Sequence, residues 1–175
     1  MIPSYVNIDH LDSGIKPLIL SLGRIPNIET MTNCEGHIYR ELDLMPTKGG
    51  CVYFLRVPEE HNKLIHGIEL YCNDHCYFDT HSILSANSSR QTIDGLFEPY
   101  EDKGWNNLFI QMNKNQQEAY FQRAEVRKQE LLKGWSELNQ VTLDYIKNNI
   151  TKDIDSLPYQ NKDDGARPLT MCGAW

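Results

Sequence analysis

Residues 114–150 carry a long helical pattern. Its large apolar residues recur at steps of three, four or seven, which places them in one stripe along a helix. The stripe consists of Tyr120, Ala124, Leu131, Trp135, Leu138 and Tyr145. A helix with one apolar side must lie against another layer of structure. We therefore predict that this helix covers the core and that its aromatic residues are core residues rather than cofactor contacts.

Shorter patterns before this helix predict alternating strands and helices. β-branched and aromatic runs predict strands, and apolar residues at helical spacing between cap residues predict helices. In the first third we expect a strand over 4–8, a helix over 12–23, a strand over 28–32 and an apolar strand over 50–57. The first three elements have the order of a βαβ unit, and the apolar strand is typical of one covered on both faces.

The middle of the chain gives less regular patterns. We predict a short helix over 58–66, strands over 68–71, 76–78 and 105–112, and a polar, turn-rich segment over 85–94. The predicted class is therefore α/β, with α+β as the alternative: a βαβ start, a mixed sheet and a long C-terminal amphipathic helix. We find no internal repeat.

The length of 175 residues fits one domain, because a chain of this size buries enough apolar surface to form its own core. We predict a single α/β domain over 1–156, followed by a C-terminal tail over 157–175. The tail carries prolines and glycines without a period. Its last residue, Trp175, has a large apolar side chain, so we expect the tail to be docked on this chain or on a second copy.

The charge balance restricts the partners. The chain has 24 acidic against 17 basic residues, a formal net charge of -7, which makes nucleic acid an unlikely partner. Basic residues within 123–133 alternate with glutamates, so we expect a solvated helix face. No apolar run reaches the roughly 20 residues that span a bilayer, so no membrane partner is expected. Five cysteines without a signal-peptide pattern predict thiols in the cytoplasm.

One short segment combines groups that carry chemistry: Cys34, Glu35, Gly36 and His37, directly after a predicted strand. Ligand sites in α/β proteins often follow strand ends. A thiol, a carboxylate and an imidazole can supply a nucleophile, an acid–base group and an orienting partner. Cys34, Glu35 and His37 are therefore the candidate catalytic residues, and Gly36 permits a positive φ or a close approach of ligand.

Two other interpretations of this segment stay open. The first is a tight turn with a buried cysteine and a histidine that binds backbone. The second is a metal site: Cys34 and His37 have a spacing that suits zinc, and Cys72 and His75 offer a second pair. We expect no cofactor, with zinc as the alternative, because a chain with this much core does not need a structural metal.

Three functions are compatible with these patterns. The first is a small-molecule-binding domain or enzyme with its pocket at the Cys34–His37 turn. The second is an oligomeric interaction module that uses the tail, and the third is a structural zinc module. The chain lacks the glycine-rich phosphate loop, the dinucleotide fingerprint and the nucleophile elbow of α/β-hydrolases, so no motif supports those reactions.

The same segment carries a family resemblance. A helix and strand that lead into Asn33-Cys34-Glu35-Gly36-His37, followed by Val52-Tyr53-Phe54, resemble a group of short bacterial and mobile-element proteins with a Ser-Cys-Glu-Gly-His segment. The later pattern Arg127, Leu131, Trp135, Leu138 is also similar to theirs. More remotely, the turn is similar to the Ser-Cys-Ser-Gly-Arg segment of the wybutosine-tRNA methyltransferase family, with Glu35 and His37 as departures. That resemblance implies an α/β fold, and the acidic balance argues against tRNA as substrate.

Overall fold

The computed structural model describes residues 11–40, 46–84, 88–97 and 109–158. Its helices include α1 (Lys16–Leu22), α2 (Asn62–Asn73) and the long α4 (Lys114–Asn149), with the 3-10 helices η2 (Glu59–His61) and η3 (Ile154–Ser156). Its strands include β1 (Glu29–Cys34), β2 (His37–Ile38), β3 (Thr47–Lys48), β4 (Gly50–Pro58), β5 (Phe78–Leu84) and β6 (Ser88–Gly95).

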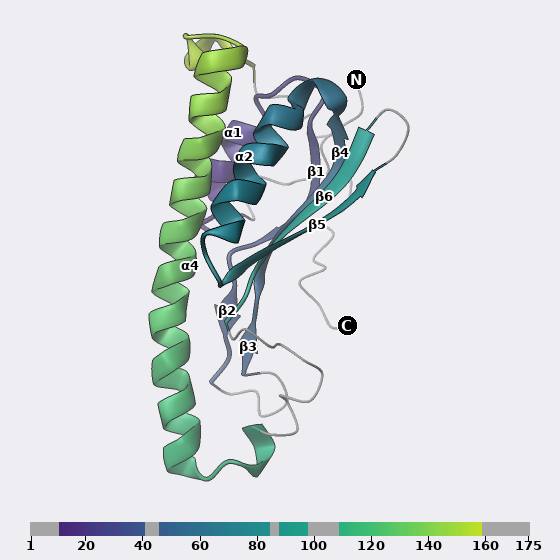
Figure 1. Ribbon diagram of the computed structural model, residues 1–175. Helices are drawn as coiled ribbons and strands as arrows, with labels where there is room; N and C mark the ends of the chain where they lie inside the picture. The colour runs from purple at the N-terminus through teal and green to yellow at the C-terminus, as the bar shows by residue number, and fades with distance from the viewer. Residues whose placement is uncertain (1–10, 41–45, 85–87, 98–108, 159–175) are drawn as a thin grey trace, which may run out of the picture.

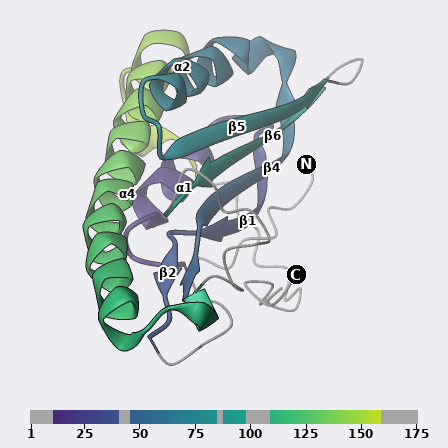
Figure 2. The ribbon, with the colours of Figure 1, turned by 60° about the horizontal axis from the view of Figure 1, so that its bottom comes forward.

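A four-stranded sheet in the order β1-β4-β6-β5 forms one layer, and the pair β2-β3 forms a small second sheet. Every pairing among the described strands is antiparallel, so the predicted mixed sheet is wrong for these strands. The helices α1, α2 and α4 gather on one side of the large sheet, and α4 runs along the whole length of the molecule (Figures 1 and 2). Antiparallel pairing with helices on one side is the α+β form of the predicted class.

The core lies between this sheet and α4. All six residues of the predicted stripe are buried, and Leu131, Trp135 and Leu138 have no exposed surface. The indole of Trp135 packs where Gly50 and Gly95 stand opposite each other on β4 and β6. A Cβ on either glycine would lie within 3 Å of the Trp135 ring, at 2.8 Å for Gly50 and 2.9 Å for Gly95. The missing side chains therefore provide the space for the largest core residue.

The predicted class, α/β with a long C-terminal helix, is confirmed, as are the helix within 12–23 and the long helix after residue 114. The predicted strand over 4–8 lies outside the described residues. The strand over 50–57 is present as β4, in which buried and half-buried residues alternate up to Leu55. Its core-facing residues include Val52 and Phe54.

Several predictions for the middle of the chain are wrong. Of the strand predicted over 76–78, only Phe78 lies in a strand, where it begins β5. The helix does not end at Gly67 but continues to Asn73, because Leu64, Ile68 and Cys72 form its buried side; this excludes a strand over 68–71. Much of the polar segment 85–94 belongs to strand β6, because its backbone pairs with β4 on one side and β5 on the other. Residues 109–111, expected in a strand, are helical. Most of the tail, residues 159–175, lies outside the described residues.

Candidate functional site

The Cys34–His37 segment forms a turn between two strands. β1 ends at Cys34 and β2 begins at His37, so Glu35 and Gly36 make the connection. Gly36 has a φ of 94°, which side chains disfavour, as its sequence position suggested. A Cβ there would also lie 3.1 Å from the Phe97 ring and 3.2 Å from the backbone nitrogen of Gly50. The turn is therefore packed tightly against its surroundings.

A reciprocal pair of hydrogen bonds fastens this turn to the segment before α1. The backbone N–H of Glu35 donates to Oδ2 of Asp12 over 3.1 Å. In return, the backbone N–H of Gly14 donates to Oε2 of Glu35 over 2.6 Å. Each carboxylate thus satisfies a backbone donor of the other segment, which fixes the two segments relative to each other.

Helix α4 holds the same turn from the other side. Lys128 Nζ lies 2.7 Å from Oε1 of Glu35, and the two side chains are only 15% and 14% exposed. Lys128 also donates to the carbonyl oxygen of Gly36, and the indole N–H of Trp135 donates to the carbonyl oxygen of Glu35 over 3.1 Å. The predicted solvated face is therefore wrong for Lys128, which turns inward. Lys133 follows the prediction: it is 75% exposed and pairs with Glu137.

Three potential metal ligands converge beside the turn. The side-chain donor atoms of Asp12, Cys34 and His37 all lie within 4.8 Å of one another. Nε2 of His37 is 3.2 Å from Oδ2 of Asp12, and these two side chains are 31% and 29% exposed. Cys34 is fully buried. The cluster therefore combines a buried thiol with two groups that reach solvent.

The structure unites some of the predicted site residues and separates others. Cys34 and His37 come together, whereas the Glu35 side chain is bound by Gly14 and Lys128. Among the described residues, the grouping that holds Cys34 and His37 contains neither Cys72 nor His75. Cys72 lies on the buried side of α2, where burial raises the pKa of its thiol to about 12.

Asp12 was not predicted from the sequence as a site residue. Its partner Glu35 is 23 residues away, so no local motif joins them. Lys128 was also missed, because it is 93 residues from Glu35 and sits among basic residues that do face solvent. The only local signal for Asp12 was its position just before α1. Acidic residues that merely cap a helix have the same position, so this signal does not identify a site.

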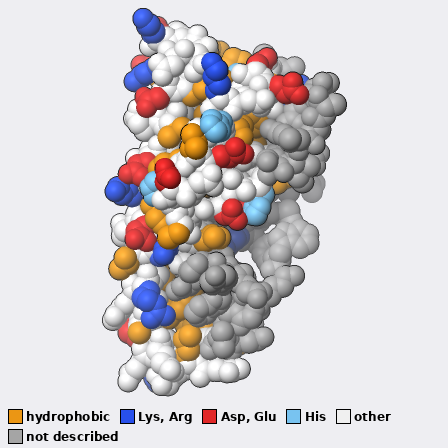
Figure 3. All heavy atoms as spheres, viewed as in Figure 1, with side chains coloured by type: hydrophobic (Ala, Val, Ile, Leu, Met, Phe, Trp, Pro, Cys, Tyr) orange, Lys and Arg blue, Asp and Glu red, His pale blue; other side chains and the backbone are white. Residues whose placement is uncertain are grey.

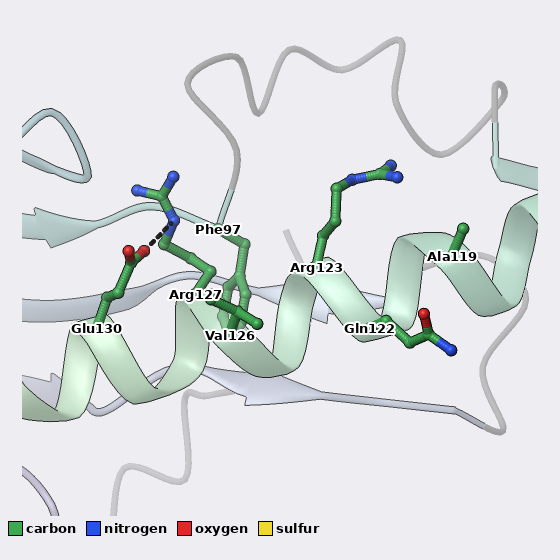
Figure 4. A pocket seen from close by; sticks show the side chains of 7 residues that line it. All are labelled: Phe97, Ala119, Gln122, Arg123, Val126, Arg127 and Glu130. Atoms are coloured by element: carbon green, nitrogen blue, oxygen red, sulfur yellow. Dashed lines mark ion pairs between the residues drawn. The ribbon is translucent and has the colours of Figure 1, made fainter.

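A groove of about 550 Å³ lies along α4, and its lining includes none of the turn residues. It is lined by Phe97, Ala119, Gln122, Arg123, Val126, Arg127 and Glu130. Arg123 and Arg127 project to one side of the helix and Gln122 to the other, while Arg127 is paired with Glu130 over 3.1 Å (Figure 4). On the face drawn in Figure 3, Lys and Arg side chains are interspersed with Asp and Glu. The lining of the groove contains none of Asp12, Cys34 and His37, so these potential metal ligands lie at the turn and not in the groove.

No family model, curated protein or solved structure matches this chain. The resemblance to short proteins with a Cys-Glu-Gly-His segment stays a hypothesis. In the part of the chain that the structure describes, no helix combines the length and the apolar character needed to cross a membrane.

Proposed function

We propose that this protein binds a small molecule at the β1–β2 turn through a divalent metal ion of the zinc class held by Asp12, Cys34 and His37. One observation carries the proposal: the three donor atoms lie within 4.8 Å of one another although Asp12 is distant in sequence from the other two. Zinc binds sulfur at about 2.3 Å and nitrogen or oxygen at about 2.0–2.2 Å, so ligands of one ion lie less than about 4.5 Å apart, and the three side chains would draw slightly together on binding.

The chemistry of the donors selects the metal. A thiolate with an imidazole and a carboxylate suits zinc, cobalt(II) or nickel(II), whereas magnesium and calcium prefer oxygen ligands alone. Three protein ligands leave a coordination position for water or a small molecule, which is the pattern of catalytic rather than structural zinc sites. The partial exposure of His37 and Asp12 gives that position access to solvent.

In this proposal Glu35 is a positioning residue. Its carboxylate is occupied by Gly14 and Lys128, and its backbone N–H holds the Asp12 carboxylate. Hydrogen bonds to a metal-binding carboxylate orient it and tune its basicity. The side chain of Glu35 thus acts on the metal through the turn that it fixes, without touching the metal.

Cobalt(II) titration of the chelator-treated full chain tests the proposal, because a cobalt–thiolate bond has a charge-transfer absorption that can be followed directly. We expect one equivalent to bind and zinc to displace it. Asp12→Asn and His37→Gln should each weaken binding by more than about 10-fold to 100-fold, which is the loss typical of partners that only hydrogen-bond to a metal ligand. Cys34→Ser should abolish the thiolate absorption.

Two matched variants serve as controls. Cys72→Ser removes another buried thiol, and His81→Gln removes a histidine that is 67% exposed on the sheet. Neither should change the cobalt titration. Absence of a thiolate absorption in a folded wild-type protein would overturn the proposal, and so would an absorption that persists in Cys34→Ser.

A further inference from the structure

Cys51 on β4 carries a second thiol, beside Cys34 on the neighbouring strand β1. In the antiparallel ladder between β1 and β4, Cys34 stands directly opposite Cys51. Directly opposed residues of such a ladder project from the same face of the sheet. The structure holds both residues as thiols, with Cys34 fully buried and Cys51 partly accessible.

We propose that Cys34 and Cys51 are a modification site: a peroxide-class oxidant joins them in a disulfide that removes the thiolate from the metal site. The metal-linked part of this inference rests on the proposed function. Opposed residues in an antiparallel ladder have Cα atoms about 4.5 or 5.5 Å apart, and disulfides need about 4.4–6.8 Å. Both spacings of the ladder satisfy the Cα requirement of a disulfide.

The difference in exposure sets the order of the steps. The Cys51 thiolate attacks hydrogen peroxide, so that a sulfur–oxygen bond forms, the oxygen–oxygen bond breaks and hydroxide leaves. The sulfur of Cys34 then attacks the sulfenic sulfur of Cys51 and expels a second hydroxide. Together the two thiols lose two protons and two electrons, and the peroxide is reduced to two molecules of water.

The disulfide and the metal compete for one sulfur atom. Zinc binds the thiolate of Cys34, and a thiolate that is bound to zinc cannot also form a disulfide. With free zinc at about 100 times its dissociation constant, the metal-free fraction falls about 100-fold, and the rate of cross-linking should fall with it. Oxidation of the pair should conversely abolish cobalt binding.

Peptide mapping of the full chain tests this inference. The metal-free protein is treated with equimolar hydrogen peroxide, the remaining thiols are alkylated, and the digest is analysed by mass spectrometry. We expect one linked species that joins the peptides of Cys34 and Cys51 and that disulfide reduction releases. Cys51→Ala should prevent the link and leave the protein folded, because this side chain is only half-buried. Cys76→Ala, at an exposed cysteine, should leave the link unchanged.

The outcomes separate the two proposals. Cross-linking that zinc slows, with cobalt binding lost on oxidation, supports the inference. Oxidation of Cys76 while Cys34 and Cys51 stay reduced overturns it, and so does cross-linking at an unchanged rate in a protein that binds cobalt. Cross-linking in a folded protein that binds no cobalt supports the disulfide and overturns the metal site alone. The mapping on the wild-type chain does not depend on whether any variant folds.

Discussion

At the scale of single residues, the Cys34–His37 turn is held by buried charge. Glu35 and Lys128 form an ion pair at 2.7 Å with little solvent around it. Such a pair contributes modest net stability, but removing one partner leaves the other charge buried and uncompensated. Lys128 also donates to the carbonyl oxygen of Gly36, so its loss reaches the backbone of the turn.

Replacing Lys128 tests how much the stability of the protein depends on the buried ion pair with Glu35. Lys128→Met should lower the free energy of unfolding by about 3 kcal/mol, because the Glu35 carboxylate loses its cation. Lys133→Met, on the solvated side of the same helix, should change it by less than about 1 kcal/mol. The double variant Glu35→Gln with Lys128→Met should recover part of the loss. Urea unfolding measures all three values, and equal effects at the two lysines would contradict the assignment.

The sheet carries a second local electrostatic feature at Asp94. Burial raises the pKa of this carboxyl, the neighbouring carboxylate of Asp79 raises it further, and His81 opposes both. The folded state therefore holds the Asp94 proton more tightly than the unfolded chain does. Asp94 therefore favours folding more at acid pH, and this contribution is lost as pH rises from the unfolded pKa through the folded pKa.

Asp94→Asn should accordingly stabilise the protein at neutral pH, by roughly 0.5 kcal/mol for a partly exposed group. The gain should disappear below about pH 3, where the carboxyl is protonated in both states. Urea unfolding at a series of pH values measures it. A variant less stable than wild type at pH 7 would show that the pairing of Asp94 with His81 outweighs burial.

At the scale of elements, the arrangement depends on where glycine allows close contact. Gly50 begins β4 under the Trp135 ring, whereas Gly67 lies inside α2. A Cβ at Gly50 would lie 2.9 Å from the carbonyl oxygen of Cys34, and backbone cannot move aside cheaply. A Cβ at Gly67 would meet a methyl group of Val141 at 3.4 Å, which is an ordinary contact.

The same substitution should therefore have opposite effects at the two positions. Gly50→Ala should destabilise the protein by about 1–3 kcal/mol through overpacking. Gly67→Ala should stabilise it by about 0.5–1 kcal/mol, because alanine favours a helix interior over glycine. Thermal unfolding of both variants measures these effects, and each variant serves as the control for the other. Stabilisation by Gly50→Ala would mean that Trp135 is less tightly packed than the structure indicates.

At the scale of the whole molecule, the candidate site connects segments that are remote in sequence. Asp12 precedes α1, Cys34 ends β1, and Lys128 and Trp135 belong to α4. Unfolding of the sheet or of α4 would disperse these groups. A ligand that binds the assembled site should therefore stabilise the entire fold.

Adding metal measures how much ligand binding stabilises the folded state. With zinc at about 100 times its dissociation constant, the free energy of unfolding should rise by about 2.7 kcal/mol. The chelated protein should unfold at the lower temperature, and Cys34→Ser should show no zinc-dependent shift. Differential scanning calorimetry with and without chelator measures the change. A shift of equal size in Cys34→Ser would place the metal elsewhere.

The sequence alone determined the features that local periodicity and local composition encode. The apolar stripe of α4 could be predicted because its residues repeat along one helix. The positive φ of Gly36 could be anticipated because glycine adopts such a conformation readily. The mixed α/β class followed from the order of such patterns. The polar strand β6 was not readable, because pairing on both sides stabilises a segment whose own composition is typical of turns.

The groups that surround the turn are brought there by long-range packing. Asp12 lies 23 residues before Glu35 and Lys128 lies 93 residues after it, so their meeting depends on how α1 and α4 pack against the sheet. The register between β1 and β4 likewise decides that Cys34 faces Cys51. Packing and register minimise the free energy of the whole chain, and no local pattern specifies them.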